Sequence, residues 1–89
     1  MKKHLNIKIY GLVQGIFFRA TAKERANGLG ISGFAKNESD GSVYMEAEGE
    51  EKNLNKFVKW CYLGPPMAQV EKVLVTEDKL KNFSQFEIS

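Results

Sequence analysis

The chain has 89 residues, with 13 lysines and arginines against 11 aspartates and glutamates, which gives a net charge of +2. This charge is too small to indicate a nucleic-acid partner or a charged membrane surface, so we expect neither. Hydrophobic residues make up 43% of the chain and charged residues 27%, as in an ordinary soluble globular protein. We expect one domain over residues 1–89.

Cys61 is the only cysteine, so no disulfide can form within the chain, and this favours a reducing compartment. The basic start of the chain resembles that of a signal peptide, but Asn6 and Lys8 interrupt any apolar run that would follow. No stretch approaches the roughly 18 apolar residues of a membrane span. We therefore expect a cytoplasmic protein that does not contact a membrane.

Apolar and polar residues alternate over residues 5–10, which is the period of a strand with one buried face. A turn with two glycines follows, and the period then changes to that of a helix. The predicted apolar face of this first helix consists of Phe18, Ala22, Ala26 and Leu29. Gly30 is placed to end it.

Residues 31–37 predict a second strand, and Asp40-Gly41 supplies the turn of a hairpin into a third strand that ends at Gly49. A second helix is predicted after Glu50 and Glu51, because negative charge is favoured at a helix N-terminus. Its predicted apolar face consists of Leu54, Phe57, Val58 and Cys61. Gly64 and the two prolines after it end this helix.

Val70, Val73 and Val75 predict a fourth strand, although the step of three between Val70 and Val73 breaks the alternation. That break predicts a bulge or a late start of the strand. Residues 77–82 predict a polar connection, and residues 86–88 a short last strand.

The order strand–helix–strand–strand–helix–strand is that of the split βαβ, ferredoxin-like α+β sandwich. We expect an antiparallel sheet with two helices on one face. In this topology the first two strands run parallel and the third lies between them. Their C-terminal ends therefore meet at one edge of the sheet, which brings the turn at residues 11–19 close to Asn37.

Residues 11–19 read Gly-Leu-Val-Gln-Gly-Ile-Phe-Phe-Arg, a turn between a strand and a helix. Such a turn leaves backbone N–H groups unpaired at the positive end of the helix dipole. With a guanidinium nearby, these donors would bind an anion, most naturally a phosphoryl group. Taken alone, the stretch is equally compatible with a tight turn followed by a surface arginine.

A second block contains Gly33-Phe34-Ala35-Lys36-Asn37, Asp40-Gly41-Ser42-Val43 and Ala47-Glu48-Gly49. Together the two blocks closely resemble the acylphosphatase family. The first resembles its G-x-V-Q-G-V-x-F-R element, with Ile16 in place of the usual valine. The second resembles its G-[FWY]-[AV]-[KRQ]-N-x-x-x-G-x-V element. The step at residues 64–66 and the aromatic C-terminal strand are also similar, so the resemblance covers nearly the whole chain.

The resemblance implies a cytosolic enzyme that hydrolyses the carboxyl-phosphate bond of acyl phosphates to a carboxylate and inorganic phosphate. It implies that Arg19 and Asn37 are catalytic and that a loop binds the phosphate mainly through backbone N–H groups. The residues of that loop are Gln14, Gly15, Ile16, Phe17 and Phe18. The substrate is then a small molecule, and we expect a monomer without a cofactor. Glu38 departs from the family pattern, and its carboxylate would repel a dianionic substrate if it turned inward.

Other functions of the same fold stay open: an acylphosphatase-like module that binds anions without useful turnover, or an RNA-binding module. Residues 33–35 weakly resemble part of an RNA-recognition strand, but the full basic and aromatic pattern is absent. One histidine and one cysteine without a joining motif do not predict a metal site. We expect His4 to be structural or solvent-facing and Cys61 to be a small core residue. The acidic residues between 46 and 51 are expected to form a solvated strand edge and a helix cap.

Overall fold

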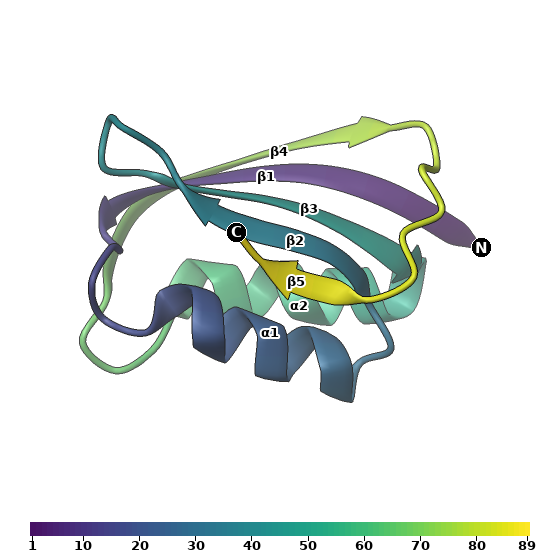
Figure 1. The fold of residues 1–89 in the computed structure, drawn as a ribbon, viewed down its shortest axis with the longest axis horizontal. Coiled ribbons are helices and arrows are strands. Elements are labelled where there is room, and N and C mark those ends of the chain that lie inside the picture. Colours follow the sequence, from purple (N-terminus) through teal and green to yellow (C-terminus); the bar gives the residue numbers. More distant parts are fainter.

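The structure is a computed structural model that describes residues 1–89, folded as two helices and one five-stranded sheet (Figure 1). The helices are α1 (Phe18–Gly28) and α2 (Glu51–Leu63). The strands are β1 (Lys2–Leu12), β2 (Ser32–Asn37), β3 (Val43–Glu50), β4 (Gln69–Asp78) and β5 (Phe86–Ile88). Neither helix is long and apolar enough to cross a membrane.

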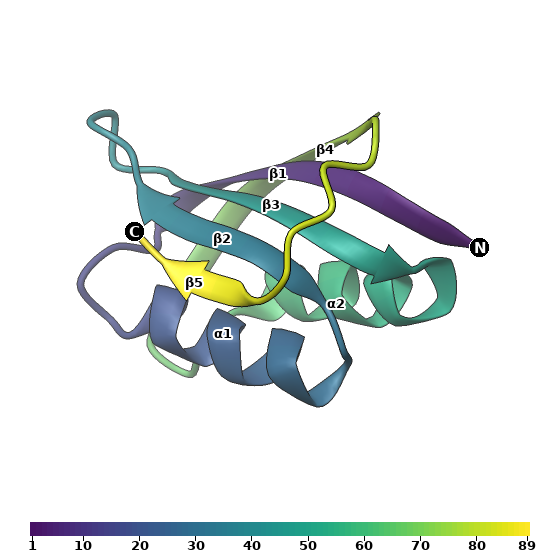
Figure 2. The same ribbon diagram turned by 45° about the vertical axis from the view of Figure 1, so that its right-hand side comes forward.

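The strands are arranged in the order β4-β1-β3-β2-β5, with β3 between β1 and β2 as the topology predicts. β1 pairs antiparallel with β3 and β4, and β3 pairs antiparallel with β2. β5 pairs parallel with β2 and so adds one parallel pair to the antiparallel sheet. Both helices cover the same face of the sheet (Figures 1 and 2), which confirms the ferredoxin-like α+β fold.

The core lies between the sheet and the two helices and contains sixteen buried hydrophobic residues. The ring of Trp60 lies 5.2 Å from that of Phe18 and 6.0 Å from that of Phe57, measured between centroids. Trp60 therefore belongs to the core, whereas Tyr62 is 57% exposed, a distinction that the sequence alone left open. Cys61 is buried as expected, and burial raises the pKa of its thiol.

The predicted bulge lies where β4 passes the end of β1. Tyr10 pairs with Lys72 but Gly11 pairs with Val70, so Glu71 is an extra residue on β4. Gly11 has a φ of 129°, and a Cβ atom there would lie 2.0 Å from the carbonyl oxygen of Gln69. Only glycine allows the two backbones to approach this closely.

Residues 79–85, which we call the strap, connect β4 and β5 at opposite edges of the sheet. The strap passes over the face of the sheet that the helices leave uncovered (Figure 2). Glu46 and Glu48 lie beneath it with exposures of 8% and 0%. The expectation that this acidic stretch is solvated was therefore wrong for these two residues, because the covering segment comes from a distant part of the chain.

Candidate active site

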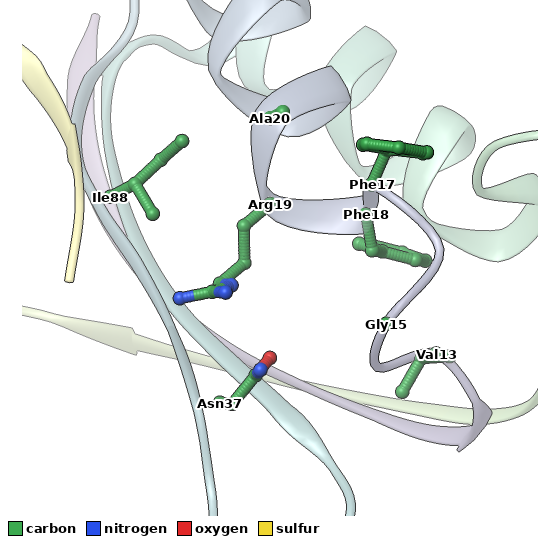
Figure 3. Close-up of a pocket in the computed structure, with 8 residues that line it drawn as sticks. All are labelled: Val13, Gly15, Phe17, Phe18, Arg19, Ala20, Asn37 and Ile88. Carbon is green, nitrogen blue, oxygen red and sulfur yellow. The ribbon is translucent and has the colours of Figure 1, made fainter.

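A pocket of about 280 Å³ lies at the edge of the sheet where β1 and β2 both end (Figure 3). Its walls come from the loop after β1, the first turn of α1, the end of β2 and β5. The residues that line it are Val13, Gly15, Phe17, Phe18, Arg19, Ala20, Asn37 and Ile88. The two predicted catalytic residues therefore share one pocket.

The loop between β1 and α1 has an unusual backbone shape. Gly15 has a φ of 75°, and Phe17, the residue that caps α1, has a φ of 65°. This left-handed conformation costs a non-glycine residue on the order of 1–3 kcal/mol, so neighbouring contacts have to hold it. One such contact is the carbonyl of Phe17, which accepts hydrogen bonds from the backbone N–H of Thr21 at 3.0 Å and from its hydroxyl at 2.9 Å.

The N-terminus of α1 forms part of the pocket wall through Phe18, Arg19 and Ala20. No side chain caps this helix end by a hydrogen bond, and its first turn contains no acidic residue. The positive end of the helix dipole is therefore not neutralised by the protein itself. A helix start of this kind is suited to binding an anion.

Arg19 extends from the first turn of α1, and its guanidinium points toward the side chain of Asn37 (Figure 3). Its Nη1 donates a hydrogen bond of 2.8 Å to the carbonyl oxygen of Ser89. Ser89 is itself held beside β2, because its N–H donates to the carbonyl of Ala35 at 2.8 Å. The contact with Ser89 orients the guanidinium and leaves other donors of the fork for a ligand.

Asn37 is the last residue of β2 and directly precedes the hairpin into β3. Within that hairpin the hydroxyl and the N–H of Ser42 donate to the carboxylate of Asp40 and lower the pKa of Asp40 to about 2. Glu38 does not line the pocket, and its carboxylate lies 3.6 Å from the Nζ of Lys36. The inward-turned carboxylate that would repel a dianion is therefore not present.

Gln14 joins the two halves of the site without lining the pocket. Its Nε2 donates to the carbonyl of Glu38 at 2.8 Å and to the carbonyl of Ser42 at 2.9 Å. The side chain thus ties the loop after β1 to the hairpin after β2. Ile16 also lies outside the pocket lining, whereas Gly15, Phe17 and Phe18 belong to it.

Four residues at the site were not predicted from the sequence. Val13 lies within the first motif and Ala20 directly follows it, so a predicted site extending over the whole motif and one residue beyond would have included both. Ile88 and Ser89 have no motif of their own and reach the site only because β5 pairs with β2. No group of three or more His, Cys, Asp or Glu side chains is placed to hold a metal ion.

A family model described as Acylphosphatase matches residues 5–88, nearly the whole chain. The chain belongs to the acylphosphatase family. An acylphosphatase from Rubrobacter xylanophilus is 45% identical over 76 residues, covering 85% of this chain and 69% of that protein. One from Archaeoglobus fulgidus is 42% identical over 85 residues, covering 96% of each chain. The crystal structure of acylphosphatase from Bacillus subtilis matches with a TM-score of 0.95 at 34% identity, covering 100% of this chain and 99% of that one.

These comparisons confirm the family resemblance carried by the two sequence motifs, and with it the assignment of the chain as an acylphosphatase enzyme. The alternative of a module that binds anions or RNA without turnover is not favoured.

Proposed function

We propose that the pocket hydrolyses acyl phosphates through Arg19, Asn37 and the backbone N–H groups of residues 15–18. One observation carries the proposal: Arg19 and Asn37 come from separate segments, and their side chains point toward each other across one pocket at the N-terminus of α1 (Figure 3). Such an arrangement places cationic and dipolar donors on one side of a phosphoryl group and a carboxamide on another.

The chemistry of an acyl phosphate explains why these groups suffice. The leaving group is a carboxylate, which departs without being protonated. The reaction therefore requires that the phosphoryl oxygens be neutralised and that water be held in line with the bond that breaks. Arg19 and the N–H groups of the loop provide the first of these, because their donors are already oriented before the substrate arrives.

Asn37 provides the second requirement in this proposal. Its carboxamide oxygen accepts a hydrogen bond from the attacking water, and its NH₂ group donates to the substrate. The water oxygen bonds to phosphorus as the bond to the carboxylate oxygen breaks. Because neither Arg19 nor Asn37 is a useful general base, a phosphoryl oxygen of the substrate takes the proton that the water loses. The products are a carboxylate and inorganic phosphate.

The proposal is tested by steady-state hydrolysis of benzoyl phosphate with purified protein. We expect Arg19→Ala to lose binding and turnover together, with kcat lower by about 10²–10³ if its donors act mainly in the transition state. Arg25→Ala is the matched control, because Arg25 is an exposed arginine of the same helix that does not line the pocket. Parental kinetics for Arg19→Ala would exclude its assigned role.

We also propose that the enzyme acts as a monomer in the cytoplasm on a small-molecule substrate, without nucleic acid or membrane partners. The small net charge supports the absence of nucleic-acid and membrane partners. The single, buried cysteine supports a reducing compartment such as the cytoplasm. Light scattering at working concentration tests the oligomeric state, and a dimeric mass would contradict the proposal.

A further inference from the structure

Three ionisable side chains that the mechanism does not use lie together beneath the strap. His4 of β1 has no exposed surface, and Glu46 and Glu48 of β3 are 8% and 0% exposed. The Nδ1 atom of His4 lies 2.8 Å from a carboxylate oxygen of Glu48, and its Nε2 atom lies 2.9 Å from one of Glu46. Both ring nitrogens of the buried histidine thus have a carboxylate partner, which a residue that only fills the core would not need.

This geometry gives each ring nitrogen of His4 a carboxylate oxygen as its neighbour. An ionised carboxylate only accepts hydrogen bonds, so each ring nitrogen of His4 has to donate one. The ring is therefore placed to donate from both nitrogens, one to Glu46 and one to Glu48. A ring that donates from both nitrogens carries one positive charge beside two buried negative charges, and buried charges of this kind require partners.

Glu48 also binds the backbone of the strap. Its carboxylate accepts hydrogen bonds from the N–H groups of Lys81, Asn82 and Phe83, the last two at 3.2 Å. Asn82 has a φ of 59°, a left-handed conformation that asparagine tolerates and that turns successive N–H groups toward one anion. The ring of Phe83 packs on His4 with 5.8 Å between centroids.

Further charged and polar groups around the cluster come from the strap and from β1, β3 and β4. The Nζ of Lys81 and the hydroxyl of Tyr44 each donate to Glu46 at 2.8 Å. Asp78 of β4 lies 3.8 Å from the Nζ of Lys81 and accepts a hydrogen bond from Asn6. The strand β2 and the helices contribute no charged group that bonds to the cluster.

Burial disfavours the ionised form of both glutamates, yet the hydrogen bonds that their carboxylates accept outweigh this effect on the pKa. For Glu46 the donors are Lys81, Tyr44 and His4, and they hold its pKa below the ordinary value. For Glu48 the backbone of the strap and His4 have the same effect on the pKa. Both groups therefore stay ionised at neutral pH and bind the strap in that state.

The strap leads directly into the active site. It continues into β5, where Phe86 is buried in the core and Ile88 lines the pocket. The next residue, Ser89, accepts the hydrogen bond from Arg19. The strap therefore acts together with the pairing of β5 with β2 to hold the acceptor that orients Arg19.

We propose that His4, Glu46 and Glu48 form an acid-sensitive latch whose members are positioning residues for Arg19. The imidazolium and the strap N–H groups bind the ionised glutamates and keep β5 beside β2. When the glutamates take up protons, the latch opens, β5 loosens and Arg19 loses its contact with Ser89. The link to catalysis depends on the proposed function, whereas the latch itself does not.

The first test follows the parent protein by NMR and needs no variant. At pH 7 we expect two ring N–H signals for His4. On acidification we expect the amides of residues 81–83 and the Nε–H of Arg19 to shift together with the carboxyl carbon of Glu48, while Trp60 fluorescence is still that of the folded protein. A single ring N–H at pH 7 would overturn the proposal, and so would strap or Arg19 signals that change only with global unfolding.

The second test compares Glu48→Gln with Glu71→Gln, an exposed carboxylate on β4 that has no ion-pair partner. At pH 7 we expect Glu48→Gln to raise the KM for benzoyl phosphate by about tenfold, with a smaller change in kcat, and Glu71→Gln to match the parent. If Glu48→Gln does not fold, Glu46→Gln takes its place. A folded variant with displaced strap amides and parental KM would contradict the positioning role. A parent protein without hydrolase activity would overturn the proposed function and its kinetic link to the latch, while the NMR test would still decide the latch.

Discussion

The carboxamide of Gln14 donates to the carbonyl of Glu38 over 2.8 Å, and this hydrogen bond ties the loop after β1 to the hairpin that follows Asn37. A second donation, to Ser42, uses the other hydrogen of the same NH₂ group. The relative placement of Arg19 and Asn37 therefore depends on a side chain that lies outside the pocket.

Replacing Gln14 by alanine should separate the two halves of the site while leaving both proposed catalytic side chains in the protein. We expect kcat for benzoyl phosphate to fall by about tenfold, because the loss of a hydrogen-bonded partner costs about 1–3 kcal/mol. The measurement is steady-state kinetics, with melting temperature as a check that the protein is folded. An unchanged kcat in a folded variant would show that the contact does not position the site.

Asn37→Ala should reduce turnover more than binding. The carboxamide is assigned to the attacking water, whose position matters chiefly in the transition state, so we expect kcat to fall by about 10²–10³ with little change in KM. Asn27→Ala, a variant of an exposed asparagine in α1, is the control. A rise in KM with an unchanged kcat would instead assign Asn37 to substrate binding.

Two glycines give a matched test of the backbone geometry. Gly11→Ala should destabilise the protein by at least about 1–3 kcal/mol, because the φ of 129° is strained for alanine and the added Cβ would meet the carbonyl of Gln69. Gly28→Ala should be neutral or stabilising by up to about 1 kcal/mol, because that site is helical and has open space around it. Urea denaturation followed by Trp60 fluorescence measures both. A Gly11→Ala protein as stable as Gly28→Ala would refute the close-approach argument.

The free energy of unfolding should fall on acidification. The pKa values of Glu46 and Glu48 are lower in the folded protein than the ordinary value of 4.5, so the unfolded chain takes up protons first as the pH drops. Their contribution is therefore present above about pH 4.5 and is lost as the pH falls through the folded-state pKa values. Urea titrations between pH 7 and pH 3 test this. In Glu48→Gln the free energy of unfolding should depend less steeply on pH than in the parent protein. Identical slopes in the variant and the parent would contradict the assigned contribution of Glu48.

Much of the fold and part of the site could be predicted from the sequence because the relevant signals are local. The alternation in β1, the step between Val70 and Val73, and the stop at Gly64 each reflect the backbone geometry of a few neighbouring residues. The two motifs around Arg19 and Asn37 are local in the same sense, and the topology of the fold then brings them together.

What the sequence did not reveal depends on contacts between distant segments. Glu48 alternates with core residues along β3, which is typical of a solvated position, and only the strap buries it. Ile88 reaches the pocket, and Ser89 reaches Arg19, through a three-residue strand whose pairing partner no periodicity could identify. His4 illustrates both difficulties, because its burial requires the strap and its two ring contacts require glutamates from another strand.

The central claim is that Arg19, Asn37 and the N–H groups of residues 15–18 bind one phosphoryl group. A titration of ¹⁵N-labelled protein with inorganic phosphate, followed by NMR, tests this most directly. We predict that the largest and saturable shifts fall on the amides of residues 15–19, the Nε–H of Arg19 and the side-chain NH₂ of Asn37. Saturable shifts centred elsewhere on the surface, or none at these groups, would contradict the account.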